Sequence, residues 1–116
     1  MTMLEELKAL GADTDDGLRR MMNNAAFYQK MLLKFVPSVE ANPVMPFLES
    51  GDSEKAVANA HTLKGVTGNL SLTPLFKGYD EIVTALRAGD PASAKQKMTE
   101  LLPVQEAIIA CISKYQ

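Results

Sequence analysis

The sequence contains no tryptophan, only one cysteine and only one histidine among its 116 residues. The single cysteine, Cys111, excludes an intramolecular disulfide. One cysteine and one histidine also leave no set of Cys and His ligands for a structural zinc ion. We therefore expect no disulfide framework, no metal site and no cofactor held by the chain itself.

Long apolar runs are also missing, since no stretch approaches the roughly 18 consecutive apolar residues of a membrane-spanning helix. The N-terminus, Met-Thr-Met-Leu-Glu-Glu, lacks the basic start and apolar run of a secretory signal. The formal net charge is -2 and no basic patch is present, which argues against a nucleic-acid surface. These absences indicate a cytoplasmic protein that binds neither membranes nor nucleic acids.

What the chain does have is apolar residues at helical spacing. A length of 116 residues with 47% hydrophobic content is enough for one domain, which we expect to span residues 1–116. No segment shows the strand alternation that would predict a sheet. We expect an all-α protein, an antiparallel up-and-down four-helix bundle with short extra helices at the N-terminus.

Capping residues and prolines set the expected boundaries. Short helices are predicted over 2–10 and from Asp13 or Thr14 to Met22. Long core helices are predicted over 25–36, over about 53–70, from Thr73 to the Ala88-Gly89-Asp90 break, and from Pro91 to the C-terminus. Residues 37–50 contain three prolines and should form a broken region, in which Asn42 caps a short helix that begins at Pro43.

The only histidine lies in the predicted helix over 53–70. Because each helical residue turns by about 100°, Leu63, Val66 and Leu70 point away from His61, so the imidazole should be exposed if these three face the core. Five residues share the face of His61, within roughly 60° of it: Val57, Ala58, Lys64, Gly65 and Gly68.

Two glycines inside a helix are costly, about 1 kcal/mol each relative to alanine. Bare backbone at Gly65 and Gly68 would let another macromolecule bring a reactive group close to the His61 ring. Gly68 also has a structural explanation, because it approaches a helix end, where glycine is common. Lys64, three residues after His61, could neutralise an anion held at the ring, and a phosphoryl group fits this arrangement.

The segment His61-Thr62-Leu63-Lys64-Gly65-x-x-Gly68-Asn69-Leu70 resembles the His-x-Leu-Lys-Gly core motif of the histidine-containing phosphotransfer (HPt) domains of bacterial and fungal phosphorelays. The resemblance extends from Gly51-Asp52 to the Ala88-Gly89-Asp90 break and so covers most of the chain. Ser71 is a departure, because many members have glycine there. Serine is also small, so we expect any effect to fall on the following turn.

The resemblance implies a phosphoryl carrier and the same bundle architecture. His61 would accept a phosphoryl group on Nε2 from the phosphoaspartate of a receiver domain, and a second receiver's aspartate would remove it. The receiver would supply the Mg²⁺ ion and its acidic ligands. The chain has no Gly-x-x-x-x-Gly-Lys-Ser/Thr loop, so we expect neither an ATP site nor kinase activity.

The other residues of the face receive roles by the same reasoning. Lys64 would neutralise phosphate charge, while Gly65 and Gly68 would admit the receiver, and Val57 and Ala58 would form part of the docking rim. Asn69 is expected mainly to cap the helix. The acceptor that holds the Nδ1 proton of His61 is left open among four polar residues of the next helix, Lys77, Asp80, Glu81 and Thr84.

Two other interpretations stay open at this stage. The chain could be a helical scaffold or regulator that binds receiver domains without carrying phosphate, or a structural bundle with no site, which leaves Gly65 unexplained. The partners expected are receiver domains of response regulators or hybrid kinases, bound transiently by a monomer. The start at Met1 favours a free-standing protein over a domain cut from a larger kinase.

Overall fold

The computed structural model describes all residues from Met1 to Gln116 and contains seven helices and no strand. The protein is therefore all α-helical, as the sequence predicts. The helices are α1 (Met3–Ala9), α2 (Thr14–Arg20), α3 (Ala25–Ala41), α4 (Met45–Ser50), α5 (Ser53–Asn69), α6 (Thr73–Arg87) and α7 (Pro91–Ser113).

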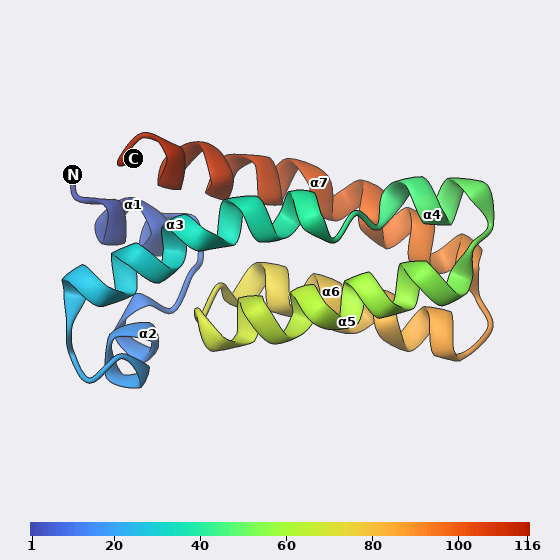
Figure 1. Ribbon diagram of the computed structural model, residues 1–116, viewed down its shortest axis with the longest axis horizontal. Coiled ribbons are helices and arrows are strands. Elements are labelled where there is room, and N and C mark those ends of the chain that lie inside the picture. The colour runs from blue at the N-terminus through green and yellow to red at the C-terminus, as the bar shows by residue number, and fades with distance from the viewer.

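The four longest helices lie side by side along the long axis of a molecule with extents of 40 × 23 × 22 Å (Figure 1). Helix α5 packs against α6, α6 against α7, and α3 against both α5 and α7. The short helices α1 and α2 lie at one end with both termini, and α4 lies at the other end (Figure 1). This arrangement places α2 beside the C-terminal end of α5.

A single cluster of buried apolar side chains joins these helices, with members from α1 and from α3 to α7. Tyr28, Phe35 and Tyr79 are its largest fully buried members. The Tyr79 hydroxyl donates a hydrogen bond to the buried side chain of Gln105. This bond satisfies two polar groups that would otherwise destabilise the core.

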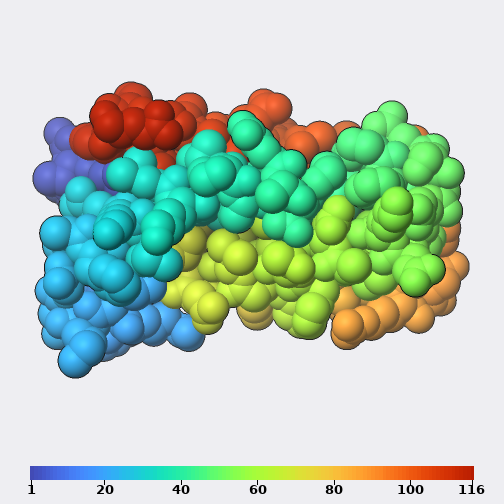
Figure 2. Space-filling model, viewed as in Figure 1, coloured from blue at the N-terminus to red at the C-terminus, as the bar shows by residue number.

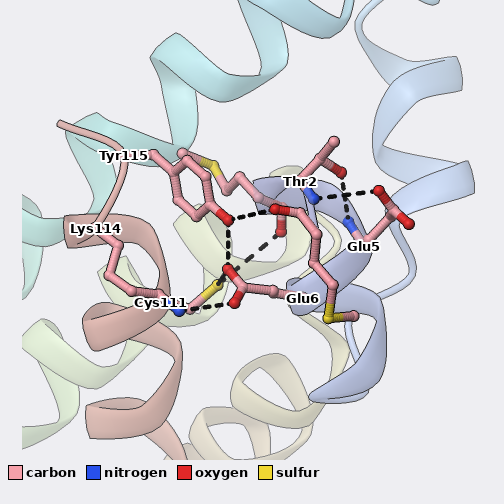
Figure 3. A network of polar contacts seen from close by, with 8 residues as sticks. Thr2, Glu5, Glu6, Cys111, Lys114 and Tyr115 are labelled. Atoms are coloured by element: carbon pink, nitrogen blue, oxygen red, sulfur yellow. Dashed lines mark hydrogen bonds and ion pairs between the residues drawn. The ribbon is translucent and has the colours of Figure 1, made fainter.

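The end of α7 is tied to α1 by a polar network around Glu6 (Figure 3). Lys114 Nζ donates to Glu6 Oε1 at 2.7 Å, and the Tyr115 hydroxyl lies 2.6 Å from Glu6 Oε2. Both hydrogen bonds hold the pKa of Glu6 below its usual range, and the one from Lys114 has the larger effect. Because Glu6 is near the start of the chain and Lys114 near its end, the network fastens the two termini together.

The predicted break at 37–50 is wrong in its details. Helix α3 continues through Pro37 to Ala41, and Asn42 ends it as its C-cap instead of starting a new helix. Proline normally interrupts a helix interior, but Pro37 is exposed, and Val36 and Val39 on either side of it pack against the core. Their burial offsets the lost backbone hydrogen bond, so the helix persists.

The next short helix also differs from its predicted start. Helix α4 begins at Met45 with Val44 as N-cap, and Pro46 occupies its first turn, so Pro43 lies before the helix. Two aromatic residues, Phe27 and Phe76, are exposed to 46% and 36% although they lie in long helices whose other aromatic residues are buried. Both lie near the end of α5 that carries the candidate site, as described below.

Candidate functional site

Helix α5 forms where the sequence predicts it. Gly51 ends α4 with a φ of +78°, and the Asp52 side chain caps α5 by accepting a hydrogen bond from the Lys55 backbone N–H at 3.1 Å. Four residues of α5 are buried at helical spacing, Ala56, Ala60, Leu63 and Thr67. His61 lies on the opposite side and is exposed, which confirms the predicted accessibility of the imidazole.

His61 lines an open cleft with a volume of about 420 Å³. From α5 the cleft receives His61, Lys64, Gly65, Thr67, Gly68 and Asn69. The residues that follow α5 add Ser71, Thr73 and Phe76, and α2 adds Asp16 and Arg20. In Figure 2 the blue surface of α2 lies beside the yellow-green surface of the end of α5. Apart from Phe76 the lining is polar or glycine, which suits a charged ligand.

Lys64 shares the cleft with His61, as its position on the helix predicts, but it has a partner within the protein. Its Nζ lies 2.9 Å from Asp80 Oδ1 on α6, and both side chains are partly exposed. A partly exposed ion pair stabilises a protein by about 1 kcal/mol or less. A phosphoryl group in the cleft would therefore compete effectively with Asp80 for Lys64.

The two glycines have different surroundings. A Cβ added to Gly65 would meet no atom within 4 Å, so the space beside His61 is open. A Cβ added to Gly68 would lie 3.0 Å from the ring of Phe76, because α6 crosses close to α5 there. A side chain at position 68 would therefore press on the Phe76 ring, whereas nothing in the fold requires glycine at position 65.

The predicted docking residues lie outside the cleft. Val57 is half-buried against the core and Ala58 is exposed, one turn before His61. Three of the four candidates for the Nδ1 acceptor are engaged elsewhere or exposed: Asp80 pairs with Lys64, Glu81 pairs with Lys97 at 3.1 Å, and Thr84 faces solvent. The fourth, Lys77, is excluded because its ammonium group can only donate hydrogen bonds.

Sequence reasoning assigned no role in the site to six residues that line the cleft: Asp16, Arg20, Thr67, Ser71, Thr73 and Phe76. The Ser71 hydroxyl donates to Asp16 Oδ2 at 2.6 Å, and Arg20 Nε donates to the same oxygen at 2.8 Å. These two hydrogen bonds hold the pKa of Asp16 below its usual range, and the one from Ser71 has the larger effect. Because 55 residues separate Ser71 from Asp16, no local pattern in the sequence links them.

Tyr28 holds α2 against the end of α5. Its hydroxyl donates to the carbonyl oxygen of Leu70 at 2.6 Å, and its ring packs on Gly17 of α2. The backbone N–H of Asp13 also donates to the carbonyl oxygen of Ser71 at 3.0 Å. These contacts fix the position from which Arg20 reaches the cleft.

The structure contains no group of three or more His, Cys, Asp or Glu side chains placed to hold a metal ion. No helix has the combination of length and apolar composition needed to cross a membrane. Comparisons with protein-family models, with curated proteins and with solved structures found no match to this chain.

Proposed function

We propose that the chain is a histidine phosphotransfer protein of a multistep phosphorelay, a phosphoryl carrier and not a kinase. It would take a phosphoryl group from a receiver-domain phosphoaspartate onto His61 and pass it to another receiver's aspartate. The observation that carries this proposal is the exposed His61 in a polar cleft with Lys64, beside open space at Gly65. We also propose that α3, α5, α6 and α7 form the antiparallel up-and-down bundle of the HPt family.

The transfer needs one nucleophile from this chain. The Nε2 lone pair of His61 attacks phosphorus, the N–P bond forms as the P–O bond to the aspartate breaks, and the electron pair leaves with the carboxylate. The proton on Nδ1 stays in place, so the product is a phosphoimidazolium and a free carboxylate. The Mg²⁺ ion expected at the receiver's own acidic site would neutralise charge on the phosphoryl oxygens during this step.

Lys64 and Gly65 support the step in different ways. Lys64 would leave Asp80 and pair with the phosphoryl oxygens, because a dianion attracts an ammonium more strongly than a single carboxylate does. The open space at Gly65 would admit the receiver's loops to within bonding distance of Nε2.

A groove next to the cleft supports docking of a receiver. It has a volume of about 690 Å³, shares Arg20 and Asn69 with the cleft, and is lined by Met21, Phe27 and Met31 among other residues. Arg20 and Lys34 are its basic members, which complements the acidic phosphorylation site expected of a receiver. A carrier that serves two partners needs this surface open, so we propose a cytoplasmic monomer with transient interfaces.

The first test is transfer from a panel of Mg²⁺-loaded, ³²P-labelled receiver domains to the wild type and to His61→Gln. We expect acid-labile, base-stable label on the wild type alone. Lys64→Gln should slow transfer roughly tenfold, a loss of about 1.4 kcal/mol of transition-state stabilisation. Lys95→Gln, which removes an exposed lysine of α7 outside the cleft, serves as the matched control and should transfer normally.

The opposite result would favour the alternative function. If no receiver labels the wild type, but some receivers bind the wild type and His61→Gln equally well, the chain is a scaffold or regulator of receivers and the carrier proposal fails.

A further inference from the structure

Arg20 is the second cation of the His61 cleft, and most of its hydrogen-bonding capacity is unused. Its Nε donates to Asp16, and its two terminal nitrogens donate no hydrogen bond within the protein. Its side chain is 53% exposed. A guanidinium held by Nε alone keeps four N–H donors, two on each terminal nitrogen, available for a ligand.

Ser71 supports the carboxylate that holds Arg20. Ser71 has a φ of +55°, in the left-handed region that favours glycine and, to a lesser degree, asparagine and aspartate. Ser71 is nevertheless buried, with only 6% of its surface exposed, and its hydroxyl donates a hydrogen bond to Asp16 Oδ2 at 2.6 Å. This hydrogen bond gives a physical reason for serine at a strained position.

The charged residues that line the cleft are Asp16, Arg20 and Lys64. Lys64 comes from α5 and Arg20 from α2, so the two cations enter the cleft from different helices. Asp80 pairs with Lys64 and Asp16 with Arg20, but only Asp16 lines the cleft itself. The neighbouring Arg19 approaches the other oxygen of Asp16 at 3.6 Å and does not line the cleft.

We propose that Arg20 binds the phosphoryl group carried by His61, with Asp16 and Ser71 as the positioning residues that aim its guanidinium into the cleft. The inference rests on the proposed function, because it names the group that holds the phosphoryl cargo of the same site. The terminal nitrogens match the spacing of two phosphoryl oxygens, which a lysine cannot reproduce. No further covalent step is required.

The proposal has a measurable consequence. Phosphohistidine loses its phosphoryl group fastest when the ring is protonated, and a cation close to the ring disfavours that protonation. Arg20 therefore lowers the pH at which the phosphorylated ring gains a proton and lengthens the lifetime of the carrier's cargo.

The test uses phosphoramidate, a small donor that phosphorylates accessible histidines without a receiver. We would label the wild type, Arg20→Gln, Arg20→Lys and Ser71→Ala, and follow the ³¹P shift against pH together with the rate of phosphoryl loss at neutral pH. Arg19→Gln is the matched control, because it removes the same charge from the same helix outside the cleft. Thermal unfolding would establish that each variant is folded.

We expect the titration midpoint of Arg20→Gln to rise by roughly half a pH unit and phosphoryl loss to accelerate about threefold, with a partial effect in Ser71→Ala. Arg20→Lys, which keeps the positive charge, should change the midpoint and the rate less than Arg20→Gln does. Arg19→Gln should match the wild type in both quantities. Equal behaviour of Arg20→Gln and Arg19→Gln would overturn the inference.

The two proposals fail in different ways. If phosphoramidate labels His61 but no receiver does, the carrier function fails, and the Arg20 comparison still reports on phosphoryl binding. If receivers label the wild type while Arg20→Gln behaves like Arg19→Gln, only the role of Arg20 fails. If neither donor labels His61, both are overturned.

Discussion

Gly17 and Tyr28 are in such close contact that a Cβ atom added to Gly17 would lie 2.2 Å from the Tyr28 hydroxyl oxygen. The same hydroxyl donates to the carbonyl oxygen of Leu70 at 2.6 Å. One tyrosine of α3 therefore connects α2 to the end of α5. The position of Asp16 and Arg20 in the cleft depends on this contact.

Gly17→Ala should destabilise the protein although alanine favours helices. Overpacking typically costs about 1–3 kcal/mol, and the gain in helix propensity is about 1 kcal/mol. Because Tyr28 is fully buried, we expect a cost near the upper end of this range, about 2–3 kcal/mol, and therefore a net loss of roughly 1–2 kcal/mol in the free energy of unfolding, measured by urea denaturation. A wild-type midpoint in this variant would mean that the Tyr28 ring moves aside freely and does not fix α2.

Tyr28→Phe tests the hydrogen bond to Leu70. The change leaves the Leu70 carbonyl oxygen without this partner and should cost about 1–2 kcal/mol at neutral pH. The comparison with Gly17→Ala separates the hydroxyl's hydrogen bond from the packing of the ring.

The same variant should alter the stability in alkaline solution. Burial raises the pKa of Tyr28 to about 12, whereas a tyrosine in the unfolded chain titrates near 10. The contribution of Tyr28 to stability is therefore fully present below about pH 10 and is lost as the pH rises through about 12. Between about pH 10 and pH 12, the free energy of unfolding should fall less steeply with pH for Tyr28→Phe than for the wild type. An equal fall in both proteins would contradict the raised pKa of Tyr28.

Gly65→Ala should have opposite effects on stability and on transfer. Since a Cβ at position 65 meets nothing within 4 Å, helix propensity should raise the free energy of unfolding by about 1 kcal/mol. The added methyl group would obstruct a docking receiver, and we expect transfer from a receiver to slow roughly tenfold, about 1.4 kcal/mol. Labelling by phosphoramidate should be unchanged, because the small donor needs less room. An equal loss with both donors would show that the methyl group disturbs His61 itself.

Glu6→Gln should weaken the contact between the termini (Figure 3). The pKa of Glu6 is held low by Lys114 and Tyr115, so its contribution to stability is present above the pKa of an unfolded glutamate. That contribution is lost as the pH falls through the lower pKa of the folded state.

Thermal unfolding should therefore show a lower Tm for Glu6→Gln at neutral pH and no difference from the wild type in strongly acidic solution. Glu106→Gln, at an exposed glutamate of α7, is the control. A Tm difference that persists unchanged at low pH would point to packing and not to the charge of Glu6.

Much of the fold could be predicted because helix ends are marked locally. Asp52 and Asp90 cap α5 and α7 as their positions indicate, and Gly89 follows α6 with a φ of +77°. The C-terminal end of α3 could not be predicted from such local signals, because the helix continues through Pro37 to Ala41. Whether Pro37 ends it depends on how well the residues around it pack against other helices, which the sequence does not show.

The residues of the candidate site also fall into two groups, those that local sequence predicts and those that tertiary packing brings in. The sequence by itself determined that His61, Lys64 and Gly65 share one exposed face, because helical geometry relates residues three and four apart. Only the tertiary structure decided that Arg20 enters the same cleft and that Ser71 supports it through Asp16. The hydrogen bonds from Ser71 to Asp16 and from Tyr28 to Leu70 join segments far apart in the chain, and only the packing of α2 and α3 against the end of α5 brings them within hydrogen-bonding distance.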